Sequence, residues 1–295
     1  MLPNPIFWNV RWYGVMIAIG LLACFAVIFL VFKKKKISEQ FTDFVFYNGV
    51  ASIVVGFVSA ALFQSFYDYL ENPSKGFKIG TSITFIGGLI GGAICFLLVY
   101  LIFRKKLKNK LVDALSIIPC AILIAHGFGR VGCFCAGCCY GKATDSIWGV
   151  KFQNLSHAVY PTQLYEAIFL FLLFGICLFL LLKYDFKHNL SVYLIAYGTF
   201  RFLIEYLRGD HRGTLVGGIS PSQFWSLLMI VVGVGLIFLM NYLVQKRKAE
   251  LQLQSETVQI ESEQSEEVVE IKQSEEVVEI KQSQIEQIQE ENDQE

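Results

Sequence analysis

Ionisable side chains within apolar stretches are the first candidates for chemistry in this sequence. Such a group inside a membrane segment costs several kcal/mol unless it has a partner or a function. Arg201, Glu205 and Arg208 are spaced by four and then three residues, which puts them on one face of a helix. The remaining candidates are His126, Arg130 and Glu166. Three arginines against two carboxylates leave a positive surplus that favours bidentate binding of an anionic phosphate. The alternative is an ion-paired network that only holds helices together.

His126 precedes Arg130 by one helical turn and lies on the same predicted face. A neutral imidazole can accept a proton at neutral pH, so we predict His126 as a general base. The alternative is a histidine at the membrane boundary that hydrogen-bonds a carbonyl group or Glu205. Arg208 is predicted to lie nearest to water.

Four of the eight cysteines crowd into residues 133–139, at Cys133, Cys135, Cys138 and Cys139. A compact run of this kind lacks the separated C-x-x-C pairs that indicate zinc. The sequence therefore favours thiols buried around a ligand site, with an extracytoplasmic disulfide or a metal site as alternatives. We predict neither a cofactor nor a metal.

The composition shows which elements must position these residues. Of 295 residues, 54% are hydrophobic and 17% charged, and the mean hydropathy of +0.50 excludes a soluble cytosolic globule. A helix crosses the hydrocarbon in about 20 apolar residues, and seven stretches approach that pattern. They are residues 12–32, 44–67, 79–103, 111–129, 161–182, 189–207 and 219–244. We predict an all-α integral membrane protein with seven transmembrane helices.

Basic clusters orient these spans, because short cytoplasmic loops collect lysine and arginine. The clusters all fall on one side if the N-terminus is outside and the C-terminus inside. They lie at residues 33–36, 104–110, 183–187 and 246–248. In this topology the ionisable side chains converge on the extracytoplasmic half of the bilayer.

The chain after residue 248 has a different composition. Residues 1–249 carry 23 basic against 10 acidic side chains, whereas 15 of the 25 acidic residues follow. The segment SEEVVEIKQ at 265–273 recurs unchanged at 274–282, and a nine-residue period matches neither helical repeat. We therefore predict a membrane catalytic domain over 1–248 and an acidic, largely disordered cytoplasmic tail over 249–295.

Several motifs resemble those of the bacterial prolipoprotein diacylglyceryl transferases. Residues 129–141 read GRVGCFCAGCCYG and keep the glycines, arginine and phenylalanine of the signature Gly-Arg-x-Gly-Asn-Phe-x-Asn-x-Glu-x-x-Gly. Further similarities follow in the family's order along residues 6–243. They are RWYG at 11–14, FIGGLIG at 85–91, YPTQLYE at 160–166, YGTFRF at 197–202 and SPSQ at 220–223.

This resemblance implies a multi-pass enzyme of the bacterial plasma membrane. The implied reaction moves diacylglycerol from phosphatidylglycerol to the lipobox cysteine thiol of a prolipoprotein signal peptide, and glycerol 1-phosphate leaves. The partners are then this lipid and this peptide, with no nucleic acid. Arg130 and Arg201 match the family's arginines, and we add His126 to them as catalytic. The residues expected to bind substrate are Arg130, Tyr13, Gly87, Gly88, Tyr197, Glu166, Glu205 and Arg208.

The chain also departs from the family pattern. Ile86 replaces the histidine before Gly-Gly-Leu, and Cys133 and Cys138 replace the signature asparagine and glutamate. The arginine late in the second helix has no counterpart around residues 58–60. Two alternatives therefore stay open, a related lipid transferase with a different acceptor and a seven-span transporter. Gly87 and Gly88 have a second interpretation as a device for close helix packing.

Overall fold

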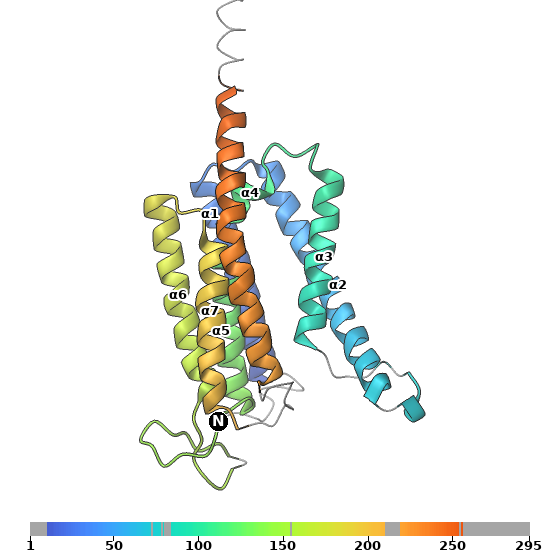
Figure 1. Ribbon diagram of the computed structural model, residues 1–295, viewed down its shortest axis with the longest axis vertical. Helices are drawn as coiled ribbons and strands as arrows, with labels where there is room; N and C mark the ends of the chain where they lie inside the picture. Colours follow the sequence, from blue (N-terminus) through green and yellow to red (C-terminus); the bar gives the residue numbers. More distant parts are fainter. Residues whose placement is uncertain are drawn as a thin grey trace, which may run out of the picture. The chain divides into compact units, whose positions relative to one another are not determined.

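The computed structural model describes residues 11–71, 73–77, 79, 84–153, 155–209, 219–253 and 255. Among these residues the regular elements are helices, and β-structure is limited to isolated bridges (Figure 1). This confirms the predicted all-α class. The nine-residue repeats lie outside the described residues, so the tail stays a prediction.

The helices follow the predicted order. They are α1 (Trp12–Lys34), α2 (Glu39–Glu71), α3 (Phe85–Phe103), α4 (Leu111–Ala114), α5 (Ile118–Ala136), α6 (Thr162–Tyr184), α7 (Asn189–Ile204) and a last helix, Pro221–Leu253. Short 3₁₀ turns, η1 (Pro73–Lys75) and η2 (Glu205–Leu207), follow α2 and α7.

Six of the described helices are long and apolar enough to cross a membrane: α1, α2, α5, α6, α7 extended through η2, and the last helix. The remaining predicted span, residues 79–103, corresponds to α3, whose described apolar stretch Gly87–Phe103 is shorter. The structure therefore supports six candidate spans and leaves the count of seven as a proposal.

The fourth span begins later than predicted. Residues 111–129 were expected to form one helix, but the short α4 ends at Ala114 and α5 begins at Ile118. Pro119 explains the shift, because proline fits the first turn of a helix, where its missing N–H is not needed. The shift carries α5 to Ala136, so that Arg130 and Cys133 are helical.

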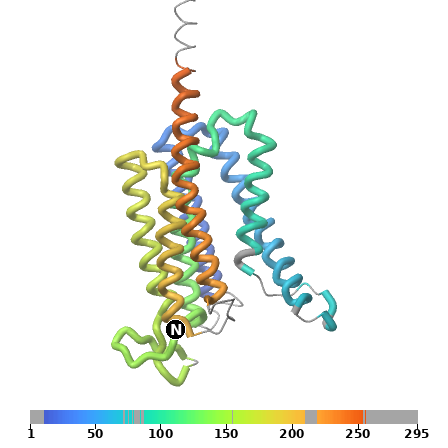
Figure 2. Tube along the Cα trace, in the orientation of Figure 1, coloured from blue at the N-terminus to red at the C-terminus, as the bar shows by residue number. Residues whose placement is uncertain are grey.

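The chain divides into two compact units, Met1–Met240 and Asn241–Glu295. In the first unit, α5 packs against α1 and α6, and the Cα trace in Figure 2 follows α6 and α7 side by side. The core among them includes Phe32, Ile117, Leu123 and Leu170. Asn189 is buried there and donates to the carbonyl oxygens of Ser116 at 2.8 Å and Cys177 at 3.3 Å, which joins the start of α7 to the turn before α5 and to α6.

Glycines bring α2 and α3 into close contact. A Cβ on Gly87 would lie 2.5 Å from the Cβ of Phe63, and one on Gly88 would lie 3.2 Å from the carbonyl oxygen of Gly56. Ser59 donates to the Gly87 carbonyl oxygen at 2.9 Å. The glycines therefore serve the small-residue packing that the sequence also suggested.

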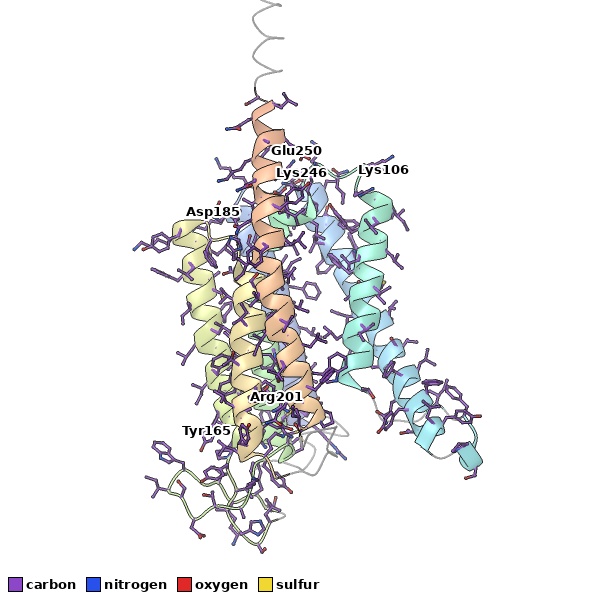
Figure 3. All side chains as sticks on the ribbon, in the orientation of Figure 1. Lys106, Tyr165, Asp185, Arg201, Lys246 and Glu250 are labelled. Atoms are coloured by element: carbon purple, nitrogen blue, oxygen red, sulfur yellow. The ribbon has the colours of Figure 1, made fainter. Side chains whose placement is uncertain are left out.

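Basic loops gather at one end of the first unit. Lys35 at the end of α1 pairs with Asp185 after α6, and Ser38 donates to Asn109 at 2.7 Å. Figure 3 shows Lys106 and Asp185 at this end, with Tyr165 and Arg201 at the other. The charged residues of the predicted site thus lie at the end remote from the basic loops.

Candidate active site

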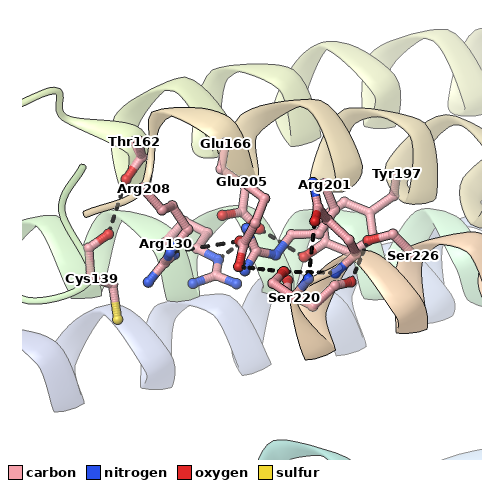
Figure 4. A network of polar contacts seen from close by, with 12 residues as sticks. Arg130, Cys139, Thr162, Glu166, Tyr197, Arg201, Glu205, Arg208, Ser220 and Ser226 are labelled. Carbon is pink, nitrogen blue, oxygen red and sulfur yellow. Dashed lines mark hydrogen bonds and ion pairs between the residues drawn. The ribbon is translucent and has the colours of Figure 1, made fainter. Parts of the chain in front are cut away.

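Glu166 is the meeting point of α5, α6 and α7 (Figure 4). Its carboxylate, 1% exposed, lies 2.9 Å from the Nε of Arg130 and accepts a hydrogen bond of 2.7 Å from the hydroxyl of Tyr197. One buried carboxylate therefore fixes an arginine from α5 and a tyrosine from α7 at the same point.

His126 of α5 lies close to Tyr197 and Glu166. Its Nδ1 is 3.4 Å from the Tyr193 hydroxyl, its Nε2 is 3.5 Å from the Tyr197 hydroxyl, and Glu166 Oε1 is 3.8 Å from Nε2. The ring also packs edge to face on Tyr197, with centroids 4.8 Å apart. The imidazole is thus surrounded by groups able to exchange protons, and its nearest carboxylate is Glu166 rather than Glu205.

A second carboxylate, Glu205, organises the other two arginines. Its Oε2 lies 2.9 Å from Nη2 of Arg201 and 3.9 Å from Nε of Arg208, while its Oε1 accepts a hydrogen bond of 3.0 Å from Ser220. The Ser220 backbone in turn donates to Oε1 of Gln223 at 3.1 Å. The residues at the start of the last helix therefore help to hold Arg201 of α7 and Arg208 after η2.

The described polar cluster carries more positive than negative charge. Arg130, Arg201 and Arg208 face Glu166 and Glu205, and Nη1 of Arg201 is buried without a hydrogen-bond partner among the described residues. A buried guanidinium N–H left unpaired is costly, which favours an anionic ligand at this point. The arrangement can bind a phosphate group.

Arg208 corrects one expectation. It was predicted to lie nearest to water, yet its side chain is 3% exposed, against 20% for Arg130. The reason is the 3₁₀ turn η2, after which the backbone N–H of Lys142 bonds to the Leu207 carbonyl at 2.8 Å and encloses Arg208.

The cysteine run, residues 133–139, forms a turn that brings the chain back toward Cys133 at the end of α5. Gly137, at φ 67°, ends α5; its N–H bonds to the Phe134 carbonyl, and the Cys138 N–H bonds to the Cys133 carbonyl. This is the Schellman arrangement, for which glycine is the favoured residue. It brings the thiols of Cys133, Cys138 and Cys139 within 4.8 Å of one another.

These thiols are free and accessible. Cys138 is exposed and Cys133 and Cys139 are partly exposed, so the predicted burial of the thiols is wrong because the chain leaves the helix at Gly137. Hydrogen bonds from Cys133 and Cys138 lower the pKa of Cys139, and Arg208 and Arg130 lower it further.

Two buried residues at the start of α6 hold this turn. Thr162 donates to the Cys139 carbonyl at 3.0 Å, and Gln163 donates to the Cys138 carbonyl. Neither residue is among those predicted from the sequence, although both lie in the YPTQLYE motif. Tyr193 was also missed; its signal is the spacing of four residues from Tyr197.

The remaining residues predicted to bind substrate lie on α1 and α3. Tyr13 of α1 packs beside Gly132 of α5, where an added Cβ would lie 3.2 Å from the tyrosine ring. It interacts electrostatically with Arg130 and with the cysteine turn. Gly87 and Gly88 have α2 as their nearest neighbour. The Ile86 side chain lies outside the described residues.

The chain is similar to known proteins over most of its length. A protein of Clostridium tetani named phosphatidylglycerol–prolipoprotein diacylglyceryl transferase is 39% identical over 235 residues, covering 75% of this chain and 90% of its own. A Clostridium perfringens protein with the same name and the suffix 2 is 32% identical, covering 80% of this chain and 93% of its own. A Pseudoalteromonas translucida protein with the first name is 35% identical, covering 78% of this chain and 88% of its own.

The family model described as prolipoprotein diacylglyceryl transferase matches residues 4–239. That range contains α1 to α7, the arginine cluster and the cysteine turn. The chain therefore belongs to the prolipoprotein diacylglyceryl transferase family.

Proposed function

We propose that this protein transfers diacylglycerol from phosphatidylglycerol to the lipobox cysteine thiol of a prolipoprotein, and releases glycerol 1-phosphate. The names of the relatives support the reaction class and both substrates. The observation that carries the proposal is the surplus of arginines over carboxylates in this cluster, in which Nη1 of Arg201 is buried without a hydrogen-bond partner among the described residues.

Arg130 and Arg201 bind the phosphate of the lipid, and Arg208, directly after η2, supports them. Negative charge grows on the phosphate oxygen as the carbon–oxygen bond breaks, so fixed guanidinium groups stabilise the transition state more than the ground state. Glu166 and Glu205 hold the arginines in place, since each carboxylate lies 2.9 Å from one of them. Tyr13 and Tyr197 border the same site, whereas Gly87 and Gly88 pack against α2 and leave no room there for a lipid.

The acceptor thiol must lose its proton, because the thiolate is the nucleophile. His126 accepts this proton through Glu166, which lies 3.8 Å from its Nε2. The two tyrosine hydroxyls beside the ring stabilise the imidazolium that results. This route gives His126 a catalytic role without direct contact with the peptide.

The enzyme crosses the bacterial plasma membrane seven times, with its N-terminus outside and its C-terminus inside. Six helices of spanning length and the shorter α3 support the count. The basic loops at one end, with the arginine cluster at the other, support the orientation, because short cytoplasmic loops collect lysine and arginine.

The full chain in proteoliposomes with phosphatidylglycerol and a synthetic lipobox peptide tests the proposal. We expect glycerol phosphate release together with a diacylglyceryl mass increment on the peptide, and neither with a Cys-to-Ser peptide. Arg201→Gln should abolish both, while Arg104→Gln, exposed at the opposite end, should not. Glycerol phosphate release without peptide modification would contradict the proposed acceptor and indicate the related transferase.

A further inference from the structure

The cysteine turn carries a cluster of three thiols that the phosphate site does not use. The sulfur atoms of Cys133, Cys138 and Cys139 all lie within 4.8 Å of one another. Zinc–sulfur bonds of about 2.3 Å in tetrahedral geometry place the sulfurs about 3.8 Å apart. Small side-chain adjustments therefore suffice for all three to bind one ion.

The backbone fixes where these thiols lie. Gly137 turns the chain back toward Cys133, and Cys139 adopts φ 63°, a left-handed conformation that is costly for a residue with a side chain. Thr162 and Gln163, both 1% exposed, fix the carbonyl groups of the two vicinal cysteines. A strained turn anchored in this way presents its thiols in a preset arrangement.

The cluster has an open side and a suitable electrostatic environment. Cys138 is exposed, so three protein ligands leave a fourth position for another group, which is the arrangement of catalytic rather than structural zinc. Three thiolates and one Zn²⁺ carry a net charge of about −1. Arg208 and Arg130 both interact with Cys139 and offset this charge.

We infer that Cys133, Cys138 and Cys139 bind a zinc ion whose open fourth position takes the acceptor cysteine thiol of the prolipoprotein. The inference rests on the proposed function, in which that thiol must become a thiolate. A thiol that coordinates zinc is deprotonated, and its proton passes to the Glu166–His126 pair. Two of the three ligands, Cys133 and Cys138, stand where the family resemblance has asparagine and glutamate.

The bond changes balance without an oxidant or reductant. A lone pair of the acceptor sulfur forms the sulfur–carbon bond at the glycerol carbon that carries the phosphate ester. The carbon–oxygen bond breaks, and its electron pair leaves on glycerol 1-phosphate, which the arginines hold. The neutral thioether is a weaker zinc ligand than the thiolate and leaves the fourth position.

Metal content and cobalt spectroscopy of the full-length protein in detergent test the site. We expect one zinc per chain in the wild type, and thiolate-to-metal absorption bands after exchange with Co²⁺. Cys139→Ser and Cys138→Ser should each weaken zinc binding at least about 100-fold. Cys135→Ser is the matched control, because Cys135 lies in the same run but outside the cluster, and it should bind as the wild type does.

A peptide titration tests the fourth position. The lipobox peptide should change the cobalt bands, whereas its Cys-to-Ser analogue should not. The site is overturned if all three thiols react with a thiol reagent in metal-saturated protein, or if they prove oxidised to a disulfide. Full transfer activity in chelator-treated, metal-free protein would also overturn it, yet would leave the proposed function intact. Zinc binding and a peptide-dependent cobalt change without lipid transfer would support the site and contradict the proposed function.

Discussion

At the scale of single residues, Glu166 decides how the site is arranged. It accepts from Tyr197, pairs with Arg130 and faces His126, so three helices depend on one carboxylate. The sequence predicted that these residues share one half of the bilayer, because the spans and basic clusters fix their depth. It could not predict which carboxylate pairs with which arginine, since that depends on how α5, α6 and α7 rotate against one another.

Arg130→Lys tests whether the site needs a planar fork or only a positive charge. A lysine keeps the charge but cannot contact Glu166 and a phosphate with two parallel N–H groups. We expect kcat/KM for lipid transfer to fall at least about 100-fold, the scale for loss of one transition-state donor. Arg104→Lys serves as the control, and wild-type turnover by Arg130→Lys would show that Arg130 has no clamping role.

His126→Gln tests the proton acceptor. Glutamine can still hydrogen-bond the surrounding hydroxyls but cannot take up a proton, so we expect turnover to fall about 100-fold with unchanged expression. His157→Gln, on an exposed loop, is the matched control. Turnover by His126→Gln within a few-fold of wild type would assign the histidine to packing alone.

At the scale of elements, close contacts between the segments outside the helices position the site as much as the packing of helices does. Gly141 marks the crossing of three segments, where an added Cβ would lie 2.5 Å from the Leu207 carbonyl oxygen and 2.9 Å from Thr162 and Tyr160. The family signature predicted a glycine here but not its reason, because the three segments are distant in sequence. The predicted start of α5 was also wrong. Residues 111–117 are apolar enough to continue the helix in the sequence pattern, and only Pro119 indicates where it begins.

Gly141→Ala should therefore misplace both the cysteine turn and Arg208. We expect a loss of about 1–3 kcal/mol in stability from overpacking, together with loss of transfer activity. Gly129→Ala, in the same motif, is the control, since nothing lies within 4 Å of a Cβ there. The measurements are thermal unfolding in detergent and lipid transfer, and equal behaviour of the two variants would show that the crossing is not tight.

At the scale of the whole molecule, charge asymmetry connects the fold to the membrane. The lysine-rich ends of α1 and α6 are tied together through Asp185, whose pKa is lowered by hydrogen bonds from Lys187 and Lys35 against the opposing effect of burial. The arginine cluster lies at the other end of the same unit. Hydropathy and loop charge were enough to predict this polarity, because both depend on the solvent more than on tertiary contacts.

Accessibility of introduced cysteines tests the topology. Ile147 and Trp148 are exposed in the loop between α5 and α6, and a cysteine at either should react with a membrane-impermeant thiol reagent in intact cells. A cysteine in place of Lys105 or Lys108 should react only after permeabilisation. The measurement uses a background in which the four cysteines of residues 133–139 are replaced, and the reverse labelling pattern would contradict the proposed orientation.

Removal of the acidic tail tests whether the membrane catalytic domain folds and transfers lipid without it. The last helix runs to Leu253, so truncation after Ser255 keeps every described residue. Because a solvated acidic segment buries no core, we expect unchanged expression and transfer activity. A truncated protein that expresses normally but transfers no lipid would assign the repeats a role in catalysis.

The crossing at Gly141 also separates the loop that follows it from the residues it helps to position. The Thr144 N–H bonds to the Ala158 carbonyl and Val150 pairs with Val159, so the loop closes on its own stem. Its tip can thus gain, lose or exchange residues while the cysteines and arginines keep their positions. We therefore expect insertions at the tip of this loop, beside the exposed Trp148, to leave lipid transfer unchanged.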